Sequence, residues 1–286
     1  MAVNAQDVKT LREKTGAGIM DCKQALSTSG GDMNKAIKIL REKGLAEAKK
    51  RSGREAREGL VTILFSDDGS TATMVEVNCE TDFVSRTDQY RDFVQNLVRR
   101  ILDSGVEGVQ SIPDEISTMV KEAIATFGEN IVLRKIARMK KTDEKRSVFQ
   151  SYIHLDGKVG VIVEFLIGDS SKKENEEFLE FIKNIALQVA SMGPAGVSRD
   201  ELPKEIVEEQ REIFTIQARE SGKPENILDK IVKGRMEKFF AETSLLEQKY
   251  VKNNDLTCDA YRAETQKKIG TDIEIKRLAR FKLGEE

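Results

Sequence analysis

Few residues of this chain have the type and spacing that covalent chemistry needs. Its one histidine is His154, and its three cysteines lie far apart, at Cys22, Cys79 and Cys258. None of the cysteines belongs to a CxxC pair, so the sequence indicates neither a zinc site nor a disulfide framework. A hydrolytic site at His154 would need partners from elsewhere, and no GxSxG motif supports one. The residues alone favour an exposed His154 that makes a local hydrogen bond at a turn.

Motifs that bind phosphate or catalytic metal are also missing from the sequence. It contains no GxxxxGK[ST] loop, no HExxH motif and no GxGxxG motif after a strand. Carboxylates are abundant, but their spacing is typical of solvated helices and not of a paired acid and base. We therefore expect that the protein is not an enzyme, and that it has no metal site and no cofactor of its own.

An acid followed by an aromatic ring is the more unusual feature, because it stands where a predicted strand ends. Residues 76–86 read EVNCETDFVSR, in which Asp82 and Phe83 follow the polar pair Glu80-Thr81. Such a ring can be a core side chain that begins the next packed segment. It can also be an exposed hydrophobic group that is presented to a partner. The residues alone favour the buried ring.

The composition bounds the class of protein. The chain has 286 residues, of which 34% are charged, and a net charge of −2 with both signs intermixed. This balance argues against a dedicated DNA-binding protein, which needs a positive surplus on one face. The first residues show no targeting peptide, no apolar run is long enough to span a bilayer, and reduced thiols suit a cytosol. We expect a cytoplasmic protein of two or three domains.

The first part of the chain is predicted to be helical. Residues 1–43 carry apolar side chains at helical spacing in three short segments, 3–14, 19–28 and 34–43. Gly44 is expected to end the third helix. Residues 44–57 are basic and are predicted to form a helical or flexible linker. Within it, Lys49-Lys50-Arg51 is either a solvated helix face or a contact for RNA or an acidic partner.

The remainder of the chain reads as a duplication. Two predicted hairpins, at 60–77 and 148–166, turn at Asp-Gly pairs whose glycines, Gly69 and Gly157, are 88 residues apart (157 − 69). Each hairpin precedes an amphipathic helix, at 88–102 and 174–192. The segment GENIVLRKIARMKK, from Gly128, then parallels GTDIEIKRLARFKL, from Gly270, at an offset of 142 (270 − 128). Because the two offsets differ, the second copy must contain an insertion of about 54 residues (142 − 88).

The insertion is predicted to form an antiparallel helical hairpin. Residues 201–221 and 224–241 are charged and amphipathic, and they flank the turn Ser221-Gly222-Lys223-Pro224. The predicted architecture is therefore α+β. It has a three-helix domain (1–43), a linker (44–57) and two related α/β subdomains with antiparallel sheets (58–143 and 144–286), the second carrying the protruding hairpin at about 199–243.

Four segments of the sequence resemble the elongation factor Ts family. TGAGIMDCKQAL at 15–26 is similar to the family's N-terminal signature and EVNCETDFV at 76–84 to its second, while SGKP at 221–224 and GRM at 234–236 also match. The resemblance is in order along nearly the whole chain. It implies a small N-terminal domain similar to ubiquitin-associated domains, two related α/β halves and a protruding coiled coil. It also implies a function, nucleotide exchange on elongation factor Tu.

What the resemblance implies about the site is specific. By the family pattern, one segment dislodges Mg²⁺ from the nucleotide site of the partner, so that GDP leaves and GTP rebinds. This segment is Thr81, Asp82, Phe83 and Val84, with Phe83 inserted between helices of the partner. The other residues at positions that the family uses for partner contact or exchange are Arg12, Ile19, Met20, Arg51, Phe127 and His154.

The duplication bears on the choice between the two interpretations of Phe83. The offset of 88 places Gly168-Asp169-Ser170-Ser171 opposite Glu80-Thr81-Asp82-Phe83, so the second copy has no phenylalanine there. A ring that the shared fold required would be expected in both copies. The comparison therefore favours a presented ring. An RNA- or ribosome-associated protein that uses the basic linker stays the alternative, and a one-to-one complex, a homodimer and a two-to-two complex all stay open.

Overall fold

The structure, a computed structural model, describes residues 3–285 of the chain. The described chain divides into two compact units, which we treat separately. The first unit comprises residues 3–139, 155–159 and 281–285, and the second comprises residues 140–154 and 160–280. Helices and antiparallel sheets occur together, so the α+β prediction is confirmed. In the part of the chain described, no helix combines the length and the apolar character that crossing a bilayer requires.

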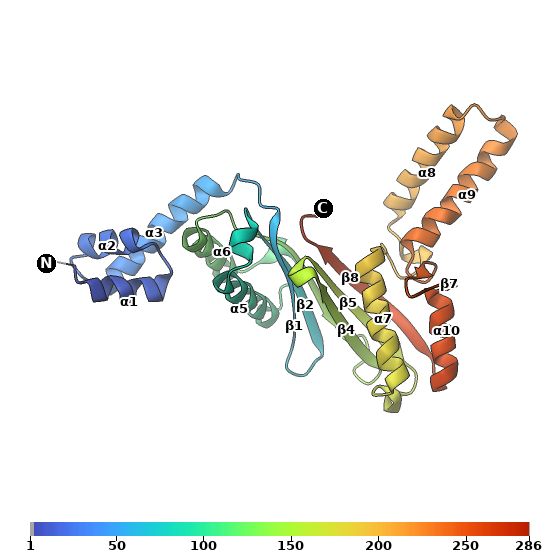
Figure 1. The fold of residues 1–286 in the computed structure, drawn as a ribbon, viewed down its shortest axis with the longest axis horizontal. Coiled ribbons are helices and arrows are strands. Elements are labelled where there is room, and N and C mark those ends of the chain that lie inside the picture. Colours follow the sequence, from blue (N-terminus) through green and yellow to red (C-terminus); the bar gives the residue numbers. More distant parts are fainter. Residues whose placement is uncertain (1–2, 286) are drawn as a thin grey trace. The chain divides into compact units, whose positions relative to one another are not determined.

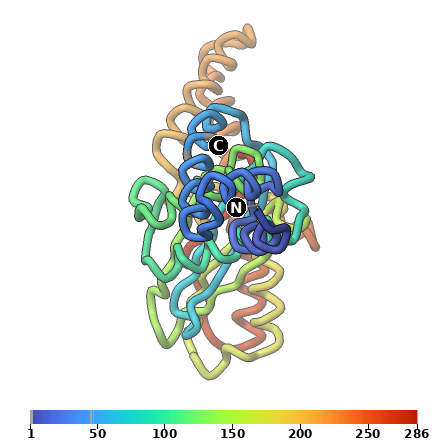
Figure 2. Tube along the Cα trace, turned by 90° about the vertical axis from the view of Figure 1, so that its left-hand side faces the viewer, coloured from blue at the N-terminus to red at the C-terminus, as the bar shows by residue number. Residues whose placement is uncertain are grey.

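Three N-terminal helices form a small bundle at the start of the first unit. They are α1 (Ala5–Thr15), α2 (Ile19–Thr28) and α3 (Met33–Arg51), the blue coils of Figures 1 and 2. Side chains of Asn4 and Asp32 accept hydrogen bonds from the first turns of α1 and α3, which is the usual way to satisfy free amides at a helix start. The buried side chains of the bundle are Leu11, Cys22, Ala25, Leu26, Ala36 and Leu40.

Helix α3 is longer than the sequence predicts, because Gly44 does not end it. The helix continues to Arg51 and packs along α6 (Asp114–Phe127). A Cβ atom added at Gly44 would lie only 2.6 Å from the Cβ of Ala125. The glycine thus allows two helices to approach closely. The prediction assumed instead that a glycine after an apolar run takes the left-handed conformation that terminates helices.

The first sheet has the strand order β1-β2-β3, formed by Glu58–Phe65, Thr71–Cys79 and Val132–Lys140. Strands β1 and β2 are antiparallel and joined by a tight turn in which Gly69 has a φ of 65°. Every residue of β2 is buried. The short helix α4 (Asp82–Ser85), α5 (Asp88–Ser104) and α6 complete the unit, with the 3-10 turn Val109–Ser111 between α5 and α6. The principal buried side chains are Val75, Val77, Tyr90, Val94, Leu97, Val98, Ile101 and Ile131.

The second sheet repeats this order. Its strands are β4 (Ser147–His154), β5 (Val159–Ile167) and β8 (Ile273–Lys282), arranged β4-β5-β8. Figure 1 shows α7 beside this sheet, as a counterpart of α5. The further elements are the 3-10 turns Leu155–Gly157, Ser170–Lys172 and Arg199–Glu201, helices α7 (Glu176–Met192) and α10 (Cys258–Ile269), and the small ribbon of β6 (Lys249–Tyr250) and β7 (Asn253–Thr257).

A buried carboxylate occupies the same place in each copy. Glu76 in β2 and Glu164 in β5 are 88 residues apart (164 − 76), and both are fully buried. Glu76 pairs with Lys135 in β3 and Glu164 with Arg277 in β8, and these cations are 142 residues apart (277 − 135). The two offsets in the sequence are thus reproduced by an equivalent ion pair in each sheet.

The Glu164 carboxylate is the better satisfied of the two. It accepts hydrogen bonds from Ser147 Oγ (2.6 Å), Thr142 N (2.7 Å) and Arg277 Nε (2.6 Å). Burial by itself raises the pKa of Glu164, but these donors outweigh it and the pKa lies below its ordinary value. The ion pair therefore persists at neutral pH.

The predicted helical hairpin is present in the second unit. Helices α8 (Lys204–Glu220) and α9 (Glu225–Thr243) lie side by side, joined by a turn in which Gly222 has a φ of 66° (Figure 1). They pack through a small apolar seam of their own. Its residues are Ala218, Val232 and Met236, with Val207, Phe214, Leu228, Ile231, Phe239 and Phe240 partly buried against them.

Two glycines inside helices allow a matched test of the close packing at Gly44. Gly44→Ala forces its methyl group against Ala125, and overpacking costs about 1–3 kcal/mol, more than the ~1 kcal/mol that alanine gains in helix propensity. A Cβ atom added at Gly234 in α9 would have no other atom within 4 Å, so Gly234→Ala should only gain helix propensity, without overpacking. We expect Gly44→Ala to lower the melting temperature measured by circular dichroism and Gly234→Ala to raise it. An equal rise in both variants would contradict the contact.

Candidate functional site

The candidate site begins where β2 ends, at a four-residue helix that the sequence does not predict. Thr81 has an extended backbone, and its hydroxyl accepts a hydrogen bond from Val84 N at 3.4 Å, so it caps α4. Asp82 occupies the first turn, where a negative charge is favourable. It also forms an ion pair with Arg86 at 2.9 Å. The segment therefore turns sharply into a helix and does not become an irregular loop.

Helix α4 buries one side and presents the other. Ser85 is buried and donates its hydroxyl to the carbonyl of Asp82 at 3.2 Å, while Val84 packs on the core of the unit. Phe83 points away from this core and 83% of its surface is exposed. The interpretation of Phe83 as a core ring is therefore wrong. The ring is an exposed apolar group on a short helix whose other side is packed.

The base of α4 is held by buried groups at the end of β2. Burial raises the pKa of the Cys79 thiol to about 11, so the thiol is neutral and can donate to the carbonyl of Thr81, 3.2 Å away. Tyr90 is buried at the start of α5, and its hydroxyl donates to the carbonyl of Val77 at 2.9 Å. Both bonds fix the backbone on either side of the strand end.

A second group of predicted site residues lies on the N-terminal bundle. Ile19 and Met20 are the first two residues of α2 and are 54% and 72% exposed. Arg12 is also exposed, on α1. The turn between these helices is specified by Gly16, whose φ of 67° suits glycine, and by Gly18, which precedes α2. The bundle buries the side chains of its small core, wholly or in part, and leaves these two large apolar ones exposed at a helix start.

Arg51 and Phe127 have contacts within the first unit. Arg51 Nη1 donates to the carbonyl of Ile124 at 3.4 Å, near the end of α6, where a cation is favourable. Phe127 packs edge-on against Tyr90 and Phe93, with ring centroids 5.4 and 5.8 Å away. Both side chains are half-buried. Their most direct contribution is to packing around α6, and the predicted partner contact stays a prediction.

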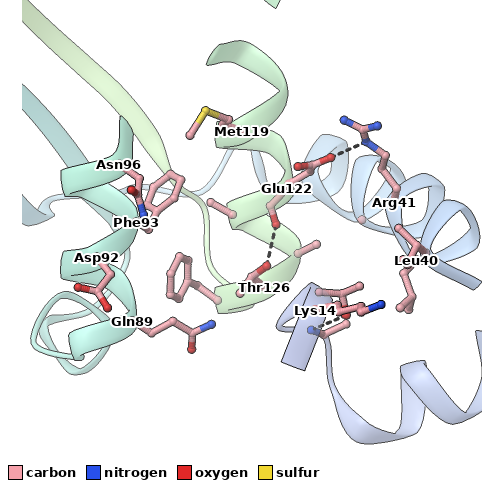
Figure 3. Close-up of a pocket in the computed structure, with 17 residues that line it drawn as sticks. Lys14, Leu40, Arg41, Gln89, Asp92, Phe93, Asn96, Met119, Glu122 and Thr126 are labelled. Carbon is pink, nitrogen blue, oxygen red and sulfur yellow. Dashed lines mark hydrogen bonds and ion pairs between the residues drawn. The ribbon is translucent and has the colours of Figure 1, made fainter. Parts of the chain in front are cut away.

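Phe127 also lines a cavity of about 610 Å³ in the first unit. Figure 3 shows side chains from α3, α5 and α6 around it, including Leu40, Phe93 and Met119. Arg41 at its margin is paired with Glu122. The hydroxyl groups among the described residues that line it, Thr15 and Thr126, donate to backbone carbonyls of Leu11 and Glu122. It is the space that remains where the N-terminal bundle meets α5 and α6.

His154 lies at the exposed end of β4, in the second unit. Its Nδ1 and the hydroxyl of Tyr152 share a hydrogen bond of 2.9 Å, and the two rings stack at 5.7 Å. The expected exposed histidine with a local hydrogen bond is confirmed. Among the described residues no group of three or more His, Cys, Asp and Glu side chains is suitably placed for a metal ion.

One residue beside α4, Glu129, is not among those that the sequence predicts for the site. The carboxylate of Glu129, between α6 and β3, accepts hydrogen bonds from the backbone amides of Glu80 and Thr81, both at 3.0 Å. One signal in the sequence could have revealed it. The segments GENIVLRK and GTDIEIKR correspond in the two copies, but the position after the first glycine is Glu129 in one and Thr271 in the other. A carboxylate in only one copy indicates a role that the other copy lacks.

Comparison with known proteins identifies the family. Residues 80–285 match the family model described as "Elongation factor TS". The class of protein is therefore a translation elongation factor, which acts in protein biosynthesis. Elongation factor Ts of Clostridium kluyveri is 43% identical over 292 residues, which cover 99% of this chain and 93% of that protein. Elongation factor Ts of Aquifex aeolicus is 41% identical over 299 residues, with 99% of each chain covered. The chain belongs to the elongation factor Ts family.

The contrast between Phe83 and Phe127 can be tested by stability measurements. Truncating a buried phenylalanine lowers the free energy of unfolding by about 3–5 kcal/mol. Because the ring of Phe127 is half-buried, Phe127→Ala should lower it by a large part of that amount. Phe83 makes little contact with its own chain, so Phe83→Ala should stay within about 0.5 kcal/mol of the parent. Thermal unfolding of both variants would check this. A comparable loss of stability in Phe83→Ala would show that the ring serves the fold.

Proposed function

We propose that this protein is the guanine nucleotide exchange factor of elongation factor Tu. Membership of the elongation factor Ts family supports the partner and the activity. The observation that carries the mechanism is the exposure of Phe83, on a short helix that buries Ser85 and packs Val84 on the core. In this mechanism the residues Thr81, Asp82, Phe83 and Val84 disturb the Mg²⁺ and phosphate site of the partner.

The physical basis is the difference in affinity between two states of the partner. A binding protein can shift a conformational equilibrium only by as much as its affinities for the two conformations differ. Burying a phenylalanine ring is worth about 1.5–3 kcal/mol. If Phe83 is buried only in the conformation that holds nucleotide poorly, this energy corresponds to roughly a tenfold to hundredfold change in GDP affinity.

The magnesium ion makes the nucleotide site vulnerable to a small displacement. Mg²⁺ demands nearly octahedral coordination, with ligands at about 2.0–2.1 Å. A ring inserted between partner helices near this ion would move ligands by more than that geometry tolerates. Asp82 is the polar neighbour of the ring, and its ion pair with Arg86 ties its side chain to the residue that follows α4. GTP then binds because it is in excess, and the factor itself need not select it.

The N-terminal bundle supplies a separate grip on the partner in this proposal. Ile19 and Met20 are exposed apolar side chains, and Arg12 adds a positive charge on the same bundle. Such a contact lowers the concentration needed for complex formation and leaves the metal site untouched. Arg51, Phe127 and His154 are retained as secondary contact residues, on family position alone. In this proposal the factor binds elongation factor Tu both in its GDP-bound and in its nucleotide-free form, and it acts in the cytoplasm.

The alternative, an RNA- or ribosome-associated protein, gains no specific support. Of the basic run, Lys49 and Lys50 are exposed, but Arg51 is half-buried and hydrogen-bonded to Ile124. Nucleic-acid binding through this segment would give an affinity that falls steeply with salt.

The proposal is tested by the rate at which fluorescent GDP leaves elongation factor Tu in a stopped-flow instrument. Phe83→Ala should slow release at saturating factor by about tenfold, which corresponds to loss of part of the energy of one buried ring. Leu179→Ala is a matched control, because Leu179 is also an exposed apolar residue but lies on α7, outside the predicted site. Equal rates for the parent and Phe83→Ala would refute the wedge.

A further inference from the structure

The geometry points to Glu129 as a positioning residue that holds Phe83 in its exposed orientation; this inference rests on the proposed function. Glu129 follows Gly128, where α6 ends, and precedes β3. Its carboxylate accepts three hydrogen bonds from the segment just before α4. They come from Glu80 N (3.0 Å), Thr81 N (3.0 Å) and the hydroxyl of Thr81 (2.5 Å).

These bonds act on the residue that begins helix α4. Thr81 is the cap of α4, and Glu129 fixes both its backbone amide and its hydroxyl. A helix of four residues is far too short to be stable by itself. Its direction therefore depends on how its ends are attached. At the N-terminal end, directly before Asp82 and Phe83, the carboxylate of Glu129 is attached beside the bond from the Cys79 thiol to the carbonyl of Thr81.

The attachment is reciprocal. The carboxylate of Glu80 accepts a hydrogen bond from the backbone amide of Asn130 at 2.7 Å and forms an ion pair with Arg54 at 3.5 Å. The amide side chain of Asn130 in turn donates to the carbonyl of Arg54 at 2.7 Å. Residues 80–81 and residues 129–130 are thus joined by a carboxylate from each side. Contacts in both directions resist rotation as well as translation of the segment that leads into α4.

The second copy of the duplication separates this arrangement from the needs of the fold. Position 271 corresponds to 129 (271 − 129 = 142), and position 169 corresponds to 81 (169 − 81 = 88). There Thr271 Oγ1 accepts a hydrogen bond from Asp169 N, and the carbonyl of Asp272 accepts one from Gly168 N, both at 2.8 Å. Gly168 stands in the place of Glu80, so both reciprocating carboxylates are absent. Ser171 stands in the place of Phe83.

It follows that the shared fold joins the two segments through a hydroxyl and a carbonyl acceptor, without a carboxylate. The additional charged acceptors occur in the copy that presents a phenylalanine. A carboxylate that accepts from two amides and a hydroxyl holds a strand end more rigidly than a threonine hydroxyl does, because hydrogen bonds to ionised groups are the stronger ones. Glu129 therefore serves the presentation of Phe83 from within its own chain.

The test is a double-mutant cycle on the full chain, read as GDP release from elongation factor Tu. Glu129→Gln keeps the size of the side chain but turns an amide group towards the donors. We expect release at saturating factor to slow about fivefold, with less than about a twofold change in the half-saturating concentration. In the Phe83→Ala background the same change should slow release by less than about twofold, because the ring that it positions is gone.

Control variants separate positioning from a general effect on folding. Thr271→Val removes the corresponding acceptor from the second copy and should leave exchange unchanged. Hydrogen–deuterium exchange should show faster amide exchange at residues 80 and 81 in Glu129→Gln. Should that variant fold poorly, Glu80→Gln weakens the same attachment from the other side and should give the same pattern of rates.

Two outcomes would overturn the inference while leaving the proposed function intact. One is a parental release rate in Glu129→Gln, when Phe83→Ala is slow. The other is an equal loss of rate in the parent and Phe83→Ala backgrounds, which would show that Glu129 acts through the fold in general. A parental rate in Phe83→Ala itself would refute the wedge, and the role of Glu129 with it.

Discussion

The hydrogen bonds between residues 80–81 and residues 129–130 determine where the chain leaves the first sheet. Strand β2 is buried along its whole length, and Phe83 is already exposed four residues after Cys79 (83 − 79), so the chain leaves the core over a short stretch. It does so because the carboxylate of Glu129 accepts the amide hydrogens that the strand end would otherwise leave free. The exposure of Phe83, the packing of Val84 and Ser85, and the start of α5 all depend on that exit.

Duplication explains how such an exit can be adapted without loss of the fold. Each copy has its own buried glutamate paired with a cation on the last strand, at Glu76 with Lys135 and at Glu164 with Arg277. This pair belongs to the shared architecture. The segment after the second strand differs between the copies, as a helix with an exposed ring in one and a polar 3-10 turn in the other. The function proposed for the chain is therefore concentrated where the two copies differ.

The elements with strong periodicity could be predicted from the sequence. Both hairpins, the helices at 88–104 and 176–192, and the hairpin of α8 and α9 are where alternation, helical spacing and Gly-Pro turns place them. Gly44 was misread because a glycine that ends a helix and one that permits a close contact look alike without the partner residue, Ala125. Helix α4 was missed because four residues carry no periodic pattern. Glu129 was missed because its hydrogen bonds join segments 48 residues or more apart.

In the proposed mechanism, Phe83 acts on the Mg²⁺ site of elongation factor Tu. The most direct measurement is the rate of fluorescent GDP release, at saturating factor, as free Mg²⁺ is lowered with a chelator, for the parent and for Phe83→Ala. If the ring acts by displacing the ion, the difference between the two proteins should be largest in Mg²⁺ and should shrink towards zero as the ion is removed. A ratio of rates that stays the same at every Mg²⁺ concentration would contradict the account.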